Sequence, residues 1–204
     1  MADANSSSAI ILAGGRSARM GRPKATLEFG GRPLLQVLVD RLSAKFQEIV
    51  VVAAPEFQLQ GNIDLCGAKI IHDEVAFAGP LGALEHGLGA IRNDRAFVCS
   101  CDLPFLDAGV ASAMVGMIGD FDAVIPNVGG MLQPLHAAYR TRCMGILASM
   151  AARGEKRLTA IVDAARVKIM NEPELRALNP ELRSFFNVNT PTDYARALAM
   201  AKRD

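Results

Sequence analysis

The sequence has few aromatic residues and little net charge, and each shortage excludes a class of protein. Aromatic residues make up 5% of the 204 positions and tryptophan is absent, so a platform that stacks the bases of single-stranded nucleic acid is not expected. Lysine and arginine number 22 against 21 acidic residues, and a net charge of +1 gives no bulk attraction for a phosphate backbone. We therefore expect no nucleic-acid partner.

Long apolar runs and a cysteine framework are also missing. The most apolar stretch, residues 110–118, contains Ser112 and Gly116 and is far too short to cross a membrane. Residues 1–8 are polar and do not resemble a signal peptide, so we expect a flexible N-terminus before one domain at residues 9–204, in a cytoplasmic protein without a membrane partner. The cysteines are too few and scattered for a disulfide scaffold or a zinc site, and we expect buried thiols at Cys66, Cys99, Cys101 and Cys143.

Apolar residues follow the periods of strands and helices in alternation. With 50% hydrophobic and 21% charged residues, the chain has the composition of a folded domain. Short apolar runs predict strands at Ala9–Ala13, Ile49–Ala53, Lys69–Ile71, Ala96–Cys101, Ala123–Pro126, Leu135–Tyr139, Val167–Met170 and Phe185–Val188. Helical spacing predicts helices at Pro33–Phe46, Leu81–Ile91, Leu106–Ile118, Arg142–Ala152, Leu158–Ala164 and Pro191–Lys202, the last capped by Thr190. This alternation favours an α/β fold, a single-domain three-layer α/β/α sandwich with a mostly parallel sheet.

A glycine-rich basic loop follows the first predicted strand. Residues 14–24 contain three glycines and four basic residues but no acidic residue. Glycine lets backbone N–H groups approach a phosphate, and arginine adds charged, forked donors, so the loop predicts a phosphate site at the carboxyl edge of the sheet. The alternative is an ordinary strand–helix turn with solvated arginines. The glycine spacing matches neither the dinucleotide-binding fingerprint nor the Walker P-loop.

Two carboxylates follow other predicted strands, and two amides are predicted on the last one. Asp102 comes directly after the strand at residues 96–101, where we expect it to be exposed and able to hold Mg²⁺ against a triphosphate. Asp73 follows the third strand, and either aspartate alone could instead cap a turn. Asn187 and Asn189 are predicted on one face of the last strand, where they would bind a ligand or the metal, or form only a capped strand–helix junction.

Five motifs in chain order resemble the molybdenum cofactor guanylyltransferases, a branch of the nucleotidyltransferases. They are the glycine-rich opening of residues 12–24, Gly79-Pro80-Leu81, Cys101-Asp102-Leu103-Pro104, Gly154-Glu155-Lys156-Arg157 and Asn187-Val188-Asn189-Thr190-Pro191. The matches run from residue 9 to about residue 196, nearly the whole chain. The resemblance implies a Rossmann-like nucleotidyltransferase fold and transfer of GMP from GTP to molybdopterin, with release of pyrophosphate.

The resemblance also implies roles for individual residues. Arg19, Lys24 and Asp102 would be catalytic, and Asp102 would hold the Mg²⁺ cofactor together with Asn189. GTP would contact Leu12, Ala13, Gly14, Gly15, Lys24, Asp73 and Asp102, and molybdopterin would contact Arg157, Asn187 and Asn189. We expect GTP and molybdopterin as substrates, and transient contact with cofactor-synthesis proteins or molybdoenzymes.

The chain departs from the guanylyltransferase pattern at one place. An Asn that is frequent near the end of the second strand is replaced by Val52-Ala53-Ala54. Asp73 and backbone groups must then read the base, and Val52→Asn is expected to sharpen the preference for GTP if the side chain at position 52 points into the pocket. The alternatives are a CTP-dependent molybdopterin cytidylyltransferase, a nucleotidyltransferase for another small phosphate, and a silent nucleotide sensor. Retention of both Lys24 and Asp102 counts against the sensor.

Overall fold

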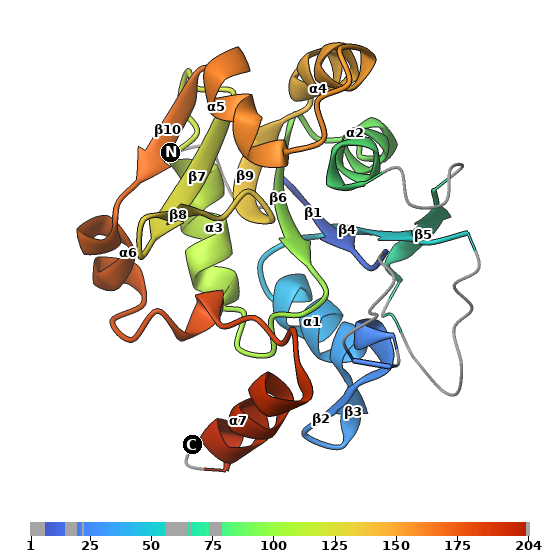
Figure 1. Ribbon diagram of the computed structural model, residues 1–204, viewed down its shortest axis with the longest axis vertical. Coiled ribbons are helices and arrows are strands. Elements are labelled where there is room, and N and C mark those ends of the chain that lie inside the picture. The colour runs from blue at the N-terminus through green and yellow to red at the C-terminus, as the bar shows by residue number, and fades with distance from the viewer. Residues whose placement is uncertain are drawn as a thin grey trace.

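The computed structural model describes residues 7–14, 20–21, 23–55, 65, 67–73 and 79–202. Eight strands of this part of the chain form one sheet in the order β10-β7-β9-β6-β1-β4-β5, with β8 paired to β7 (Figure 1). The strands are β1 Ser8–Leu12, β4 Glu48–Ala53, β5 Lys69–His72, β6 Arg95–Ser100, β7 Ala123–Val128, β8 Met131–Leu132, β9 His136–Arg140 and β10 Val167–Met170.

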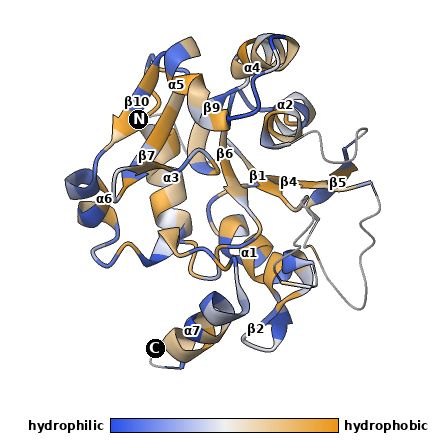
Figure 2. Ribbon diagram, viewed as in Figure 1, coloured by the Kyte–Doolittle hydropathy of each residue, from blue (hydrophilic) through white to orange (hydrophobic). Residues whose placement is uncertain are grey.

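Helices cover both faces of this sheet. They are α1 Leu34–Ser43, α2 Pro80–Ala90, α3 Ala108–Gly116, α4 Cys143–Ala152, α5 Ile161–Ala164, α6 Glu172–Leu178 and α7 Pro191–Ala201, with 3₁₀ turns η2 Lys24–Thr26, η3 Leu158–Ala160 and η4 Arg183–Phe185. One core layer lies against α1, α3 and α6, and the other lies against α2, α4 and α5. In β1, Ala9 and Ile11 belong to the first layer and Ile10 and Leu12 to the second, because successive side chains of a strand point to opposite faces. Figure 2 shows the apolar colouring concentrated on the central strands and on the helix faces turned toward them.

Strand direction fixes which residues meet at the carboxyl edge of the sheet. β1 pairs in parallel with β4 on one side and with β6 on the other, so Leu12 lies opposite both Val52 and Ser100. The chain therefore changes sides at β1, and open α/β sheets bind ligands at such a switch point. β9 runs antiparallel to β6, which brings its first residue, His136, opposite Cys99 at the same edge.

A small hairpin and the last helix form an appendage at this edge (Figure 1). The hairpin strands β2 Glu28–Phe29 and β3 Arg32–Pro33 pair antiparallel. α7 is held on it by the Tyr194 hydroxyl, which donates to the Glu28 carbonyl, and by an apolar cluster of Leu27, Phe29, Leu34, Val37, Val188 and Ala197. The chain must pass the site on its way from η4 to α7, so this contact also fixes the segment before α7.

The α/β class, the three layers and the mostly parallel sheet are confirmed. The predicted strand at Phe185–Val188 is wrong: η4 occupies its start, and none of these residues belongs to a ladder. α6 was not predicted, although Asn171 and Glu174 form a capping box at its start. β1 begins at Ser8, inside the segment expected to be flexible, while residues 1–6 lie outside the described residues.

Two expectations from composition can be compared with the described part of the chain. Cys99, Cys101 and Cys143 are free and buried, as predicted, while Cys66 lies outside the described residues. No helix among the described residues has both the length and the apolar character needed to cross a membrane.

Candidate active site

Lys24, Asp102 and Asn189 meet at the switch point of the sheet. The Lys24 Nζ donates to Asp102 Oδ2 at 2.8 Å and to Asn189 Oδ1 at 2.7 Å. These residues lie 78 and 165 positions apart in the sequence, and the fold alone brings them together. The structure thus joins three of the predicted site residues in one polar cluster.

The expectation that Asp102 is exposed is wrong. The residue is 8% exposed, and its carboxylate also accepts a hydrogen bond from the Ser100 hydroxyl. A buried carboxylate is costly unless it is paired and hydrogen-bonded, and Lys24 and Ser100 supply both kinds of partner. Asp102 is therefore held in one position before any ligand arrives.

Local capping positions the side chains that surround Asp102. η2 places Lys24 in its first position, and the Thr26 hydroxyl closes this turn on the Pro23 carbonyl. On the other side, the Val188 N–H donates to the Asp102 carbonyl at 2.9 Å.

Next along the chain, a capping box starts α7: the Asp193 N–H donates to the Thr190 hydroxyl, and the Asp193 carboxylate accepts from the Thr190 N–H. The predicted Thr190 cap is confirmed, and it ends the segment that carries Asn189.

The predicted nucleotide residues lie on β1, β4 and β5. The Ala13 N–H donates to the Val52 carbonyl at 2.8 Å, and the exposed Gly14 follows it at the edge. The Asp73 N–H donates to the Ala53 carbonyl at 2.9 Å at the end of β5. Backbone pairing therefore sets these strand ends side by side.

Asp73 also contacts α2. Its Oδ1 lies 3.4 Å from His86 Nδ1. The residue that caps the start of α2 is Gly79, whose φ of 85° and ψ of −179° fall in a backbone region that is essentially restricted to glycine. The glycine of the Gly79-Pro80-Leu81 motif therefore serves the turn into α2, which brings His86 to Asp73.

Val52 does not face the nucleotide side. Its side chain is 1% exposed and packs in the core layer of α2, where Gly87 crosses β1 and β4. The interpretation of Val52 as the base-reading position is therefore corrected. Ala54, the residue after β4, is half-buried at the carboxyl edge, and its backbone nitrogen lies next to Gly14.

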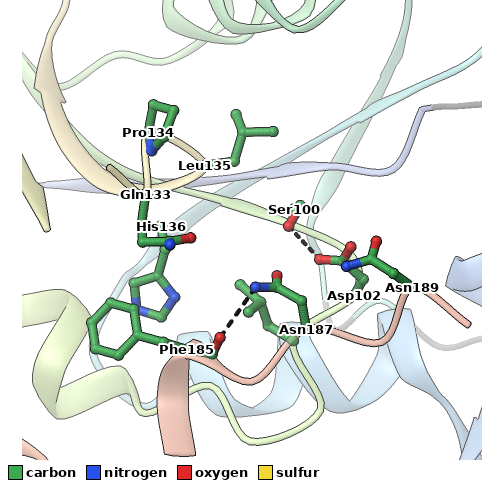
Figure 3. Close-up of a pocket in the computed structure, with 10 residues that line it drawn as sticks. Ser100, Asp102, Gln133, Pro134, Leu135, His136, Phe185, Asn187 and Asn189 are labelled. Atoms are coloured by element: carbon green, nitrogen blue, oxygen red, sulfur yellow. Dashed lines mark hydrogen bonds between the residues drawn. The ribbon is translucent and has the colours of Figure 1, made fainter. Parts of the chain in front are cut away.

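A cavity of about 320 Å³ extends from Asp102 away from the nucleotide side, toward β9 (Figure 3). It is lined by Ser100, Asp102, Leu103, Gln133, Pro134, Leu135, His136, Phe185, Asn187 and Asn189. Asn187 was predicted on a strand, but the structure places it in the irregular segment before α7. There its Nδ2 donates to the Phe185 carbonyl at 3.1 Å. Both predicted asparagines nevertheless face the same cavity.

The structure does not bring every predicted residue to this place. Arg157 is not among the lining residues of the cavity, and its highly exposed side chain pairs with Glu155 in its own loop. Gly15 and Arg19 lie outside the described residues. Gln133 and His136 were missed, because the strand pattern of residues 135–139 carried no sign that β9 is reversed.

A lysine paired with an aspartate at the switch point of an open α/β sheet, with a glycine loop on the adjacent strand, is suited to transfer from a nucleoside triphosphate. Together, fold and site define the class as nucleotidyltransferase. The chain belongs to the MobA-like NTP transferase domain family, whose model matches residues 9–169.

Individual relatives agree with the family. The chain is 32% identical to the "Probable molybdenum cofactor guanylyltransferase" of Pelotomaculum thermopropionicum over 95% of this chain and 92% of that protein. It is also 32% identical to the "Molybdenum cofactor guanylyltransferase" of Desulfosudis oleivorans, over 95% of each chain.

Solved structures agree with the fold. The "Molybdopterin-guanine dinucleotide biosynthesis protein A" of Archaeoglobus fulgidus superposes with a TM-score of 0.83 at 26% identity, covering 97% of this chain and 100% of that one. The 2-C-methyl-D-erythritol 4-phosphate cytidylyltransferase of Thermus thermophilus superposes with a TM-score of 0.71 over 96% of this chain and 98% of that one. At 19% identity, the second likeness concerns the fold alone.

Proposed function

We propose that the protein transfers GMP from GTP to the terminal phosphate of molybdopterin, releasing pyrophosphate and forming molybdopterin guanine dinucleotide. The observation that carries the proposal is the meeting of Lys24, Asp102 and Asn189 between the nucleotide strands and the cavity at β9. The names of the relatives, molybdenum cofactor guanylyltransferase, support the choice of substrates.

The oxygen atoms around Lys24 fit a Mg²⁺ ion. Asp102 Oδ2 and Asn189 Oδ1 already converge on one cation, the lysine ammonium, at 2.8 and 2.7 Å. Mg²⁺ prefers oxygen ligands and is usually held by one or two protein groups together with substrate phosphates and water. The described residues contain no group of three or more His, Cys, Asp or Glu suited to a metal, so the triphosphate would complete the shell. When bound there, the ion would neutralise charge on the phosphates.

Residues of the chain would align the two substrates and offset charge. An oxygen of the acceptor phosphate forms a bond to the α-phosphorus of GTP, the bond to the bridging oxygen breaks, and pyrophosphate leaves with the electron pair. Lys24, on moving from Asp102 to the triphosphate, would stabilise the negative charge that develops in the transition state. Positioning and electrostatics suffice for phosphoryl-group chemistry of this kind, and no covalent enzyme intermediate is needed.

The remaining roles follow from position at the edge. Leu12, Ala13 and Gly14 would line the nucleotide, and Asp73, oriented by His86, would meet the guanosine end. Gly15 and Arg19 remain predicted phosphate ligands. The buried thiols of Cys99, Cys101 and Cys143 favour a reducing cytoplasm as the place of the reaction.

The test is a comparison of nucleotides. The protein is incubated with Mg²⁺, molybdopterin and either GTP, CTP or ATP, pyrophosphate is measured, and the product is identified by mass. We expect the highest kcat/KM with GTP and a guanine dinucleotide product. Asp102→Asn protein purified in the same way controls for contaminating enzymes. A preference for CTP would move the chain to the cytidylyl branch, and no pyrophosphate with any nucleotide would favour the sensor.

A further inference from the structure

His136 is buried in the wall of the cavity, and one of its nitrogens has no hydrogen-bond partner among the described residues. The residue is 2% exposed, and among the described residues its Nδ1 finds no hydrogen-bond partner. A buried polar atom without a partner destabilises the folded state, so such atoms are rare in native structures. In Figure 3 the ring faces the cavity on the side of Asn187. A ligand in the cavity would therefore be able to supply the hydrogen-bond partner that Nδ1 lacks among the described residues.

Aromatic packing fixes the plane of the imidazole. The ring of Phe185 lies at a centroid distance of 4.2 Å with an interplanar angle of 34°, and Phe97 meets the imidazole edge-on at 5.2 Å. The backbone is fixed too, because the His136 N–H closes a turn on the Gln133 carbonyl at 3.1 Å. His136 is therefore held in place before a ligand binds.

The hydrogen bonds of Ser184 indicate which nitrogen carries the proton. The Ser184 hydroxyl oxygen accepts from the Asp107 N–H at 3.0 Å and lies 3.4 Å from His136 Nε2. Ser184 is fully buried, and because its oxygen already accepts from Asp107, we infer that its hydroxyl proton is donated to Nε2. Nε2 is then unprotonated, and in a neutral imidazole the proton resides on Nδ1. Burial lowers the pKa of His136 to about 3, so the ring stays neutral at physiological pH.

We propose that His136 is a specificity residue for the acceptor, and that its Nδ1–H donates to an oxygen or ring nitrogen of the heterocycle that enters the cavity beside Asp102. The inference rests on the proposed function in one respect: it takes molybdopterin as the molecule whose phosphate lies at Asp102 and whose ring system extends toward β9. The cavity volume of about 320 Å³ is in the range of small-molecule sites. A site with a fixed buried donor discriminates strongly against analogues that lack the matching acceptor.

The first experiment measures the tautomer and its response to ligand. The imidazole nitrogens of ¹⁵N-histidine-labelled protein are observed by NMR, and the signals of His136 are identified among the three histidines by their loss in His136→Phe. We expect a protonated Nδ1 and an unprotonated Nε2, and a shift of the Nδ1 signal when molybdopterin is added without nucleotide. A proton on Nε2, or no shift at saturating molybdopterin, overturns the proposal.

The second experiment measures binding. His136→Phe keeps an aromatic ring between Phe185 and Phe97, and we expect it to raise the Kd for molybdopterin roughly five- to tenfold, the loss of one neutral hydrogen bond. The KM for GTP should stay as in the wild type. His136→Asn, whose amide N–H₂ lies near the position of Nδ1, should bind molybdopterin more tightly than His136→Phe even if its melting temperature is lower, which a merely structural role would not produce. An unchanged Kd in a folded His136→Phe protein contradicts the proposal.

The two hypotheses fail in different ways. Binding is measured without GTP, so molybdopterin that binds through His136 but receives no GMP would refute the proposed function and leave this inference intact. GMP transfer with an unchanged Kd in His136→Phe would do the reverse. A wild-type protein that does not bind molybdopterin refutes both.

Discussion

The Lys24 ammonium lies 2.8 Å from the Asp102 carboxylate and neutralises it. Their side chains are 18% and 12% exposed, so the pair is shielded from water but not sealed from it. Asp102 cannot give the same oxygen fully to Lys24 and to a metal ion. Arrival of a magnesium–nucleotide complex would therefore release Lys24 toward the phosphates.

Replacing Asp102 should abolish turnover while the fold survives. In Asp102→Asn we expect less than a tenth of wild-type pyrophosphate release at saturating Mg²⁺, because the charged group proposed to hold the ion is gone. Lys24 keeps its bond to Asn189, so the loss of stability should be about 1.5–3 kcal/mol, as for one charge-assisted hydrogen bond. Pyrophosphate release and thermal melting measure the two effects, and activity above a tenth would exclude Asp102 as an essential metal ligand.

Lys24→Ala should lower kcat more than it weakens GTP binding. Loss of one contact to charge that develops in the transition state typically costs ~10²–10³ in rate. Steady-state kinetics, together with a direct measurement of GTP affinity, separates the two effects. Lys45→Ala, an exposed lysine just after α1, is the matched control and should behave as wild type. A raised KM with unchanged kcat would show that Lys24 only holds ground-state GTP.

Val52→Asn should destabilise the protein without changing its nucleotide preference. The amide would be buried in the apolar layer under α2, at a cost of about 1–3 kcal/mol. Ala54→Asn, two residues further along, should melt close to the wild type and raise the ratio of kcat/KM for GTP over CTP, because position 54 is at the carboxyl edge. A higher ratio of kcat/KM for GTP over CTP in Val52→Asn, together with an unchanged ratio in Ala54→Asn, would contradict the placement of these side chains.

Gly87→Ala should lower stability although alanine is the better helix former. A Cβ at this position would lie 2.8 Å from Ile10 Cγ2 and 3.1 Å from Val52 Cγ2, so α2 would have to move off the sheet. Such overpacking typically costs 1–3 kcal/mol, which is about 2–12 °C in melting temperature for a chain of this size. Gly89→Ala in the same helix is exposed and should melt at or above the wild-type temperature. Equal melting temperatures for the two variants would contradict the close packing of Gly87 on the sheet.

Glu48 should make stability depend on pH at the opposite edge of the sheet. Burial raises the pKa of Glu48, but hydrogen bonds from the Ser8 hydroxyl and the Arg92 N–H outweigh it and hold the pKa below the ordinary 4.5. A carboxylate whose pKa is lower in the folded than in the unfolded protein stabilises the fold at pH values above its unfolded-state pKa. This contribution is lost as the pH falls through its folded-state pKa. In urea unfolding, the free energy of unfolding of Glu48→Gln should be lower than that of the wild type at pH 7 and should approach it below about pH 4. Glu181→Gln, at an exposed position, should have the wild-type free energy of unfolding at every pH.

The sequence predicted the convergence of Lys24, Asp102 and Asn189, because loops after parallel strands meet at one edge whatever their separation in the chain. It did not predict the burial of Asp102, since the partner that makes burial tolerable is 78 positions away. Nor could it orient Val52. A strand buried on both faces is apolar throughout, and no alternation shows which side chains face which layer.

His136 was missed for a different reason. The pattern of residues 135–139 identifies a strand, but the same alternation reads equally well in both directions. Only the pairing of β9 with β6 and β7 shows that its beginning, rather than its end, lies beside Asp102. Direction is set by tertiary contacts and leaves no trace in local periodicity.

The strand order β9-β6-β1-β4 has a consequence for how such a protein can diversify. The residues that would handle the nucleotide follow β1, β4 and β5, whereas the wall that would meet the acceptor begins at β9, on the far side of β6. Asp102, two residues after the end of β6, would serve both halves, so β6 is the shared element between them. Substitutions on the β9 side can therefore exchange one acceptor for another while the machinery for activating a triphosphate stays unchanged.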